Sequence, residues 1–152
     1  MQGYSADPKP LKPYAVMVGV FNVALGTGLL VSRDLPKRSS LTDVLLLGVA
    51  THKYSRLLTK DRVTSVIRAP FVRYLRDAGP GEVEEEARGG GVQHAVGELL
   101  VCPYCAGLWI ATALGFGLAW QPGRTRFVLN VGTALAISDF LHHGLKAAEE
   151  RS

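Results

Sequence analysis

Residues 102–120, CPYCAGLWIATALGFGLAW, contain no charged side chain, and the rest of the chain can be interpreted outward from them. At a helical rise of about 1.5 Å per residue they cover about 29 Å, which matches the roughly 30 Å of hydrocarbon in a bilayer. Trp109 and Trp120 are aromatic residues of the kind that lie at membrane interfaces or pack between helices. This stretch therefore predicts a transmembrane helix.

Three more apolar stretches accompany it. Residues 127–145 follow after a short turn, and residues 13–33 come near the start of the chain, where a cleaved signal peptide is the alternative interpretation. Residues 39–58 would cross only if their charged side chains faced the bundle or an interface, so three crossings with a half-buried second helix is the other alternative. The predicted fold class is an all-α membrane protein, a bundle of about four transmembrane helical segments.

Small residues in the last two predicted spans would let their backbones approach closely, which is how helices associate in lipid. These residues are Gly115, Gly117, Gly132, Ala134 and Ala136. The two spans are therefore expected to pack as a helical hairpin.

The chain has 152 residues and 47% hydrophobic composition, enough for one domain. A net charge of +4 suits an anionic partner, and two cysteines exclude a disulfide-stapled secreted scaffold. We expect a tail at 1–12, a membrane domain at 13–145 with a cytoplasmic segment at 59–101, and a tail at 146–152. Two short loops join the first predicted span to the second and the third to the fourth, and twelve of the 17 Lys and Arg fall outside these loops. Because cytoplasmic segments are enriched in Lys and Arg, the chain is expected to be a multi-pass protein of the cell membrane with both termini cytoplasmic.

The segment between the second and third spans carries a basic amphipathic pattern over residues 62–76, which Pro70 should kink or split. Lying on an inner leaflet, it would attract anionic lipid at about 1 kcal/mol per cation. Alternatively, its apolar face packs on the protein's own spans. No nucleic-acid-binding motif accompanies the charge, so no nucleic-acid partner is expected. The predicted lipid or anion contacts are Lys53, Arg56, Lys60, Arg62, Arg68, Arg73 and Arg76.

Cys102-Pro103-Tyr104-Cys105 stands directly before the apolar helix, with proline at a position that a first helical turn accepts. Cys102 would be the N-cap, where backbone N–H groups and the helix dipole favour a thiolate. The four letters match a glutaredoxin redox motif, but no alternation of strands and helices surrounds them, so a soluble thioredoxin-like fold is not expected.

Counting from the turn at Gly123 places Cys105 and His142 at similar depth, with Asp139 and His52 near the same rim. Three interpretations stay open. A metal site holding zinc or iron would use Cys102, Cys105, His142, Asp139 and His52, with His94 and Glu98 as further candidates, or a CxxC from each of two chains. A thiol–disulfide relay would use both cysteines with Asp139 and His142 moving protons, although the reducing cytoplasm argues against it. The third interpretation is purely structural.

The chain resembles a family of small bacterial integral-membrane proteins, domain of unknown function family 1360, some members of which are associated with sporulation. The matching stretches are ATHKYSRLLTKDRVTS (50–65), RAPFVRY (68–74), GEVEEEARGGG (81–91), GELLVCPYCAGLW (97–109) and SDFLH (138–142). The resemblance implies an integral-membrane location and brings no established activity. It highlights Lys53, Arg56, Lys60, Asp61, Arg68, Glu98, Cys102, Cys105, Trp109 and Asp139.

From these observations we expect a non-catalytic membrane accessory or metal-binding component that acts with a protein partner or as a homo-oligomer. The alternative is an enzyme, either a membrane thiol–disulfide oxidoreductase that uses the CPYC motif or one that acts on lipid headgroups through the basic face.

Overall fold

The computed structural model describes residues 11–32 and 40–150. Residues 1–10 of the predicted tail at 1–12, the loop cations Arg33, Lys37 and Arg38, and the last two residues lie outside this range. The described residues form α1 (Leu11–Val31), α2 (Leu41–Thr59), α3 (Ser65–Arg68), β1 (Val72–Gly79), β2 (Glu82–Ala87), α4 (Gly91–Val101), α5 (Pro103–Trp120) and α6 (Pro122–Glu149).

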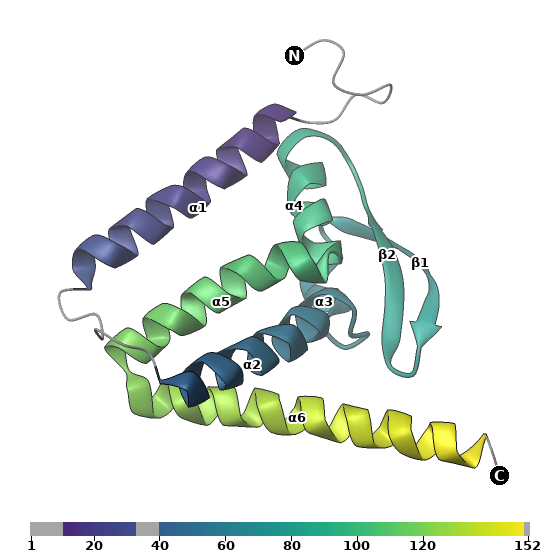
Figure 1. The fold of residues 1–152 in the computed structure, drawn as a ribbon. Helices are drawn as coiled ribbons and strands as arrows, with labels where there is room; N and C mark the ends of the chain where they lie inside the picture. The colour runs from purple at the N-terminus through teal and green to yellow at the C-terminus, as the bar shows by residue number, and fades with distance from the viewer. Residues whose placement is uncertain (1–10, 33–39, 151–152) are drawn as a thin grey trace.

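The four long helices coincide with the four predicted apolar segments, and α6 continues past residue 145. α5 lies between α1 and α2, and α6 runs along the other side of α2 (Figure 1). The mainly helical fold is confirmed. Among the described residues two helices, α1 and α5, are long and apolar enough to cross a membrane, whereas α2 and α6 carry more polar side chains.

Side-chain contacts fix the direction of each helix. α1 runs parallel to α5 in a constant register, because three contacts join residues 88 positions apart in the sequence. These are Phe21 with Trp109 (ring centroids 5.1 Å apart), Gly28 with Phe116, and Ser32 with Trp120. α2 runs parallel to α6, because Asp43 pairs with Arg126 near one end and Lys53 pairs with Asp139 near the other.

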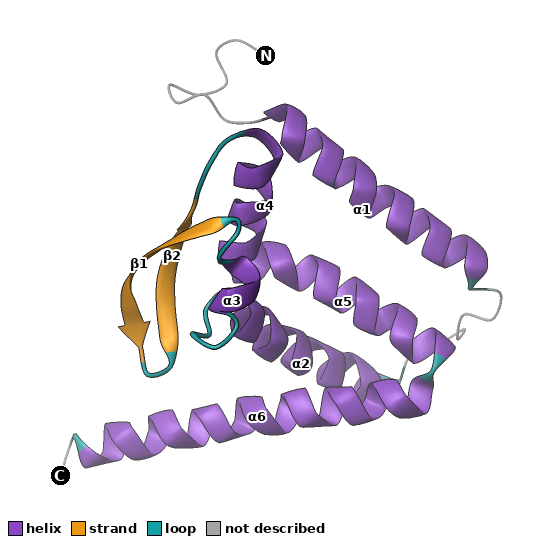
Figure 2. Cartoon of the chain, turned by 180° about the vertical axis from the view of Figure 1, so that it is seen from behind, coloured by secondary structure: helices purple, strands orange, loops and turns teal. Residues whose placement is uncertain are grey.

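These directions give the bundle two different ends. We call the end that carries residues 60–102 the polar end, and the opposite end, where α5 turns into α6 at residues 120–124, the turn end. Figure 2 shows α3, α4 and the two strands gathered at the polar end, with the start of α1 above them. The start of α5 and the ends of α2 and α6 also lie on that side.

A β-hairpin at the polar end corrects the all-α prediction. Residues 62–76, expected to form an amphipathic helix, instead form α3 and most of β1, which pairs antiparallel with β2. Pro70 cannot continue the helix of α3, and Gly81, with φ +76°, completes a turn that reverses the chain. The arginines of β1 then lie beside the acidic run of β2, in the register Arg73↔Glu86 and Arg76↔Glu84.

Small residues pack the helices where α2 meets its neighbours. A Cβ added to Gly132 of α6 would lie 2.7 Å from the ring of Tyr54 and 3.1 Å from the Cβ of Ala50, both on α2. Gly117 lies against Thr125 across the α5–α6 turn, as the predicted helical hairpin requires. Gly132 therefore allows α6 to pack closely on α2, which the sequence did not indicate, whereas Gly117 allows the predicted close contact between α5 and α6.

Candidate functional site at the polar end

Arg68 is the centre of the polar end and is fully buried. Its guanidinium joins Glu85 of β2 to the end of α2 and to the turn before α3. Every N–H donor of the side chain is used: Nε donates to Glu85 Oε2 (2.5 Å), Nη1 to Leu58 O (2.7 Å) and Thr64 Oγ1 (2.6 Å), and Nη2 to Asp61 O (2.9 Å) and Ser65 Oγ (3.1 Å). A buried charge is tolerated when it is paired and fully hydrogen-bonded. We call this cluster the Arg68 clasp. Because its hydrogen bonds reach both Glu85 on β2 and Leu58 on α2, it fixes the hairpin to the bundle.

Four further ion pairs lie on the hairpin and at its junction with α2. They are Arg56–Glu82 (2.5 Å), Arg62–Asp77 (2.9 Å), Arg73–Glu86 (2.5 Å) and Arg76–Glu84 (2.6 Å). Next to them Tyr74 donates a hydrogen bond to Asp77, and this bond to a carboxylate raises the pKa of the Tyr74 phenol. The predicted basic face therefore carries a row of ion pairs between arginines and carboxylates, which we call the acid–base ladder.

This ladder changes the prediction of a lipid-binding basic face. Six of the seven predicted contact residues pair with carboxylates, and Lys60 is the one without such a partner in the described chain. For Arg68 the prediction is wrong, because its buried side chain is closed to lipid. For the other residues lipid contact stays a prediction, since any headgroup phosphate would have to compete with a carboxylate already in place.

The two cysteines lie where α4 meets α5. Cys102 is the N-cap of α5, as predicted: its Sγ accepts a hydrogen bond from the backbone N–H of Cys105 at 3.2 Å, and Pro103 begins the helix. Both thiols are free, and Cys105 is exposed. The N-cap geometry predicted for Cys102 is therefore present.

Glu98, one turn before the cysteines, connects α4 to α1. It accepts a hydrogen bond from the hydroxyl of Tyr14, and His94 Nε2 lies 3.6 Å from its other carboxylate oxygen. The sequence predicts both Glu98 and His94 as candidate metal ligands. It gives no signal for Tyr14, because Tyr14 lies in an apolar stretch whose neighbours in space are set only by the tertiary fold.

The predicted metal centre is not assembled. Asp139 Oδ2 lies 2.5 Å from Lys53 Nζ, so this carboxylate neutralises a lysine of α2 instead of meeting the thiols. His52 and His142 are exposed, on α2 and on the far part of α6. Within residues 11–32 and 40–150, no group of three or more His, Cys, Asp or Glu side chains is placed to hold a metal ion. Matching depth along two helices does not by itself make their side chains face each other.

Sequence reasoning also missed Glu85 as the partner of Arg68. In the sequence, residues 82–86 form an acidic run with no evident partner for any one of its glutamates. A signal was present: a Gly-Pro-Gly turn at 79–81 separates a stretch that contains Arg73 and Arg76 from the glutamate-rich residues 82–86, so a hairpin would bring opposite charges together across its strands.

The fold and site together define a helical bundle with two exposed apolar helices and an ion-paired hairpin at one end. A family model for a protein of unknown function, DUF1360, matches residues 46–145. The chain belongs to this family, which confirms the resemblance seen in its motifs. The matched range begins within α2, so α1 lies outside it.

Two proteins of Bacillus subtilis (strain 168) are similar to the chain. UPF0713 protein YngL is 30% identical over 104 residues, which cover 66% of this chain and 78% of that protein. Sporulation protein YjcA is 35% identical over 71 residues, which cover 45% of this chain and 60% of that protein. No solved structure matches the chain.

Proposed function

We propose that the chain is a multi-pass integral-membrane protein in which α1, α2, α5 and α6 cross the bilayer, and that it acts as a non-catalytic accessory component. The observation that carries this proposal is the exposure of α1 and α5: only 6% of the residues in the apolar window of each helix are buried. Soluble monomers rarely expose large contiguous apolar surfaces, whereas lipid would cover these. α1, with 21 residues, is about 32 Å long, close to the thickness of the hydrocarbon layer.

The charged side chains of α2 and α6 support their inclusion in the membrane, because the two helices neutralise each other. Arg126 Nη2 lies 2.8 Å from Asp43 Oδ2, and Lys53 pairs with Asp139 at 2.5 Å. A lone charge at the centre of a span costs about 2.5–3.5 kcal/mol on insertion scales, so charges within spans usually pair. α6 has 28 residues, about 42 Å, and therefore extends beyond the bilayer at the polar end.

The orientation follows from the helix directions together with the distribution of Lys and Arg. Helices that run up, down, up and down leave the start of α1, the hairpin and the end of α6 on one side. We place this polar end in the cytoplasm, because cytoplasmic segments are enriched in Lys and Arg whether or not carboxylates balance them.

Cysteine labelling in intact cells tests this topology. In a Cys102→Ser/Cys105→Ser background, single cysteines are introduced at Thr42, Pro80, Gly123 and Gly144. A membrane-impermeant maleimide should label T42C and G123C from outside, and P80C and G144C only after permeabilisation. If T42C and P80C label from the same side, α2 does not cross. A monomer recovered in the soluble fraction without detergent would refute the membrane assignment itself.

The cellular process is suggested by one relative, whose name is sporulation protein YjcA. In a spore-forming source organism, deletion of this protein is expected to lower spore yield, and complementation should restore it. An unchanged spore yield would argue against a role in sporulation.

A protein partner or a second copy of the chain is part of the proposal. Cross-linking through P80C at the hairpin turn should capture this partner in membranes, whereas an uncross-linked monomer would argue for a protein that acts alone.

A second candidate is thiol–disulfide exchange, favoured by the position of Cys102 at the N-cap with Cys105 exposed beside it. The Cys102 thiolate would attack a partner disulfide and form a mixed disulfide. Cys105 would then displace the partner as its dithiol, leaving Cys102 and Cys105 oxidised. Cys105→Ser should trap the mixed disulfide, whereas Cys102→Ser should not. If both thiols always label as reduced and nothing is trapped, this candidate is excluded.

A further inference from the structure

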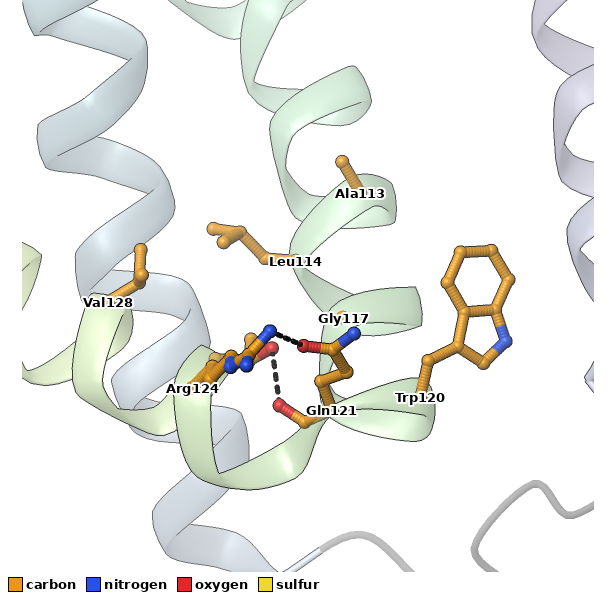
Figure 3. Close-up of a pocket in the computed structure, with 8 residues that line it drawn as sticks. Ala113, Leu114, Gly117, Trp120, Gln121, Arg124 and Val128 are labelled. Carbon is orange, nitrogen blue, oxygen red and sulfur yellow. Dashed lines mark hydrogen bonds between the residues drawn. The ribbon is translucent and has the colours of Figure 1, made fainter.

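A pocket of about 260 Å³ opens at the turn end, between the last part of α5 and the start of α6 (Figure 3). It is smaller than the roughly 300–1,000 Å³ of sites that enclose a drug-sized ligand, so it suits part of an elongated molecule. The residues that line it include Ala113, Leu114, Trp120, Gln121, Arg124 and Val128.

The pocket is apolar along one part and cationic at the other. Leu114 extends from α5 toward the space beside Val128, whereas Arg124 and Gln121 meet at the helix turn (Figure 3). Ala113 lies eight residues before Gln121, so the apolar wall reaches about 12 Å along α5 from the polar groups. A long apolar wall that ends at a cation matches an amphiphile with an anionic head.

Arg124 differs from most arginines of this protein. Six of the eight described arginines pair with a carboxylate, namely Arg56, Arg62, Arg68, Arg73, Arg76 and Arg126. Arg124 has no carboxylate partner among the described residues, and its Nη1 donates only to the neutral Gln121 Oε1, at 3.0 Å. Its positive charge is therefore available to an anion.

The start of α6 adds to this positive potential. Gln121 caps the helix without a side-chain hydrogen bond, so backbone N–H groups of the first turn keep their capacity to bind an anion. Trp120 completes the edge of the pocket, and its indole Nε1 donates to Ser32 Oγ at 2.8 Å. Tryptophan in this position is typical of the level at which lipid headgroups begin.

We propose that this pocket binds one anionic glycerophospholipid, with an acyl chain along Ala113, Leu114 and Val128 and the phosphate at Arg124. The inference rests on the proposed membrane location, because only there does the turn end lie at headgroup level with the apolar wall pointing into the hydrocarbon. It deepens that proposal by naming a lipid class and a position.

Native mass spectrometry of the full chain in detergent tests the site, with phosphatidylglycerol and phosphatidylcholine of identical acyl chains as probes. Wild type should retain one phosphatidylglycerol with about fivefold preference, which corresponds to about 1 kcal/mol for one cation near an anionic headgroup. Arg124→Gln should abolish the preference, and Ala113→Trp, which fills the apolar wall, should lower retention of both lipids. Arg88→Gln is the matched control, since Arg88 also lacks a carboxylate partner in the described chain but lies outside the pocket.

Each other outcome overturns the site. Equal retention of both lipids by wild type would indicate ordinary annular lipid. Displacement of phosphatidylglycerol by millimolar inorganic phosphate, with Ala113→Trp unaffected, would indicate a free-anion site. A loss of preference in Arg88→Gln equal to that in Arg124→Gln would indicate a general charge effect. If this test fails in a protein whose introduced cysteines still label from both sides of the membrane, only the proposed lipid site is excluded. A soluble monomer obtained without detergent would exclude the proposed membrane location as well.

Discussion

Replacing Arg68 with methionine would remove the charge that neutralises Glu85 inside the polar end. The two side chains are 0% and 4% exposed, and Nε lies 2.5 Å from Oε2. Breaking a buried ion pair by removing one partner costs about 3–5 kcal/mol, because the other charge is left unpaired. The carbonyls of Leu58 and Asp61 lose donors in the same step, so the loss should fall toward the upper part of that range.

Thermal unfolding of the full chain in detergent, followed by circular dichroism, measures the effect. For a protein of this size, about 1 kcal/mol shifts the Tm by roughly 2–4 °C, so a loss of about 4–5 kcal/mol in Arg68→Met should lower the Tm by about 8–20 °C. The matched control is Arg73→Met, whose pair with Glu86 is 69% and 44% exposed. Exposed pairs contribute about 0–1 kcal/mol, so this variant should shift the Tm by at most about 4 °C.

A double variant separates the charge effect from lost packing. Arg68→Met/Glu85→Met removes both buried charges, so it should recover much of the stability, because apolar pairs often replace buried ion pairs without loss. Recovery should be incomplete, since the Leu58 carbonyl stays without the donor that Arg68 supplied, whereas the Asp61 carbonyl still accepts from Thr64 Oγ1. The reasoning is refuted if Arg68→Met unfolds within about 4 °C of Arg73→Met, or if the double variant is no more stable than Arg68→Met alone.

Two other substitutions test the packing between α2 and α6. Gly132→Leu should destabilise the protein by about 1–3 kcal/mol because it drives a side chain into Tyr54, whereas Gly144→Leu, with open space around it, should leave the Tm unchanged or raised; equal effects would contradict the close approach. Lys53→Asp and Asp139→Lys should each lower the yield of folded protein on size-exclusion chromatography, and the double exchange should restore it; no recovery would argue against a direct pair.

Apolar length and helix capping could be predicted because both are local. The helices α1 and α5 follow from uncharged or nearly uncharged stretches of helical length, and α2 and α6 follow from apolar stretches that charged side chains interrupt. The N-cap at Cys102 follows from the residues directly after it. The family relation was also accessible, because its motifs are short and contiguous.

The helical periodicity of residues 62–76 does not decide their structure, because a turn follows them and brings β2 beside β1. Apolar residues at helical spacing do not form one continuous helix when Pro70 interrupts them and an acidic strand supplies partners for the arginines. Pairing with β2 satisfies both the backbone hydrogen bonds and the charges of β1, whereas a lone amphipathic helix would satisfy only the backbone.

The sequence by itself therefore determined the long helices, the cap at Cys102 and the family. Only the tertiary structure decided which charges meet: Asp139 with Lys53 instead of the thiols, Glu85 with Arg68, and Arg124 with no carboxylate in the described chain. The physical reason is range. A helix and its cap form between residues a few positions apart, whereas the partner of a charged side chain depends on how segments tens of residues apart fold against each other.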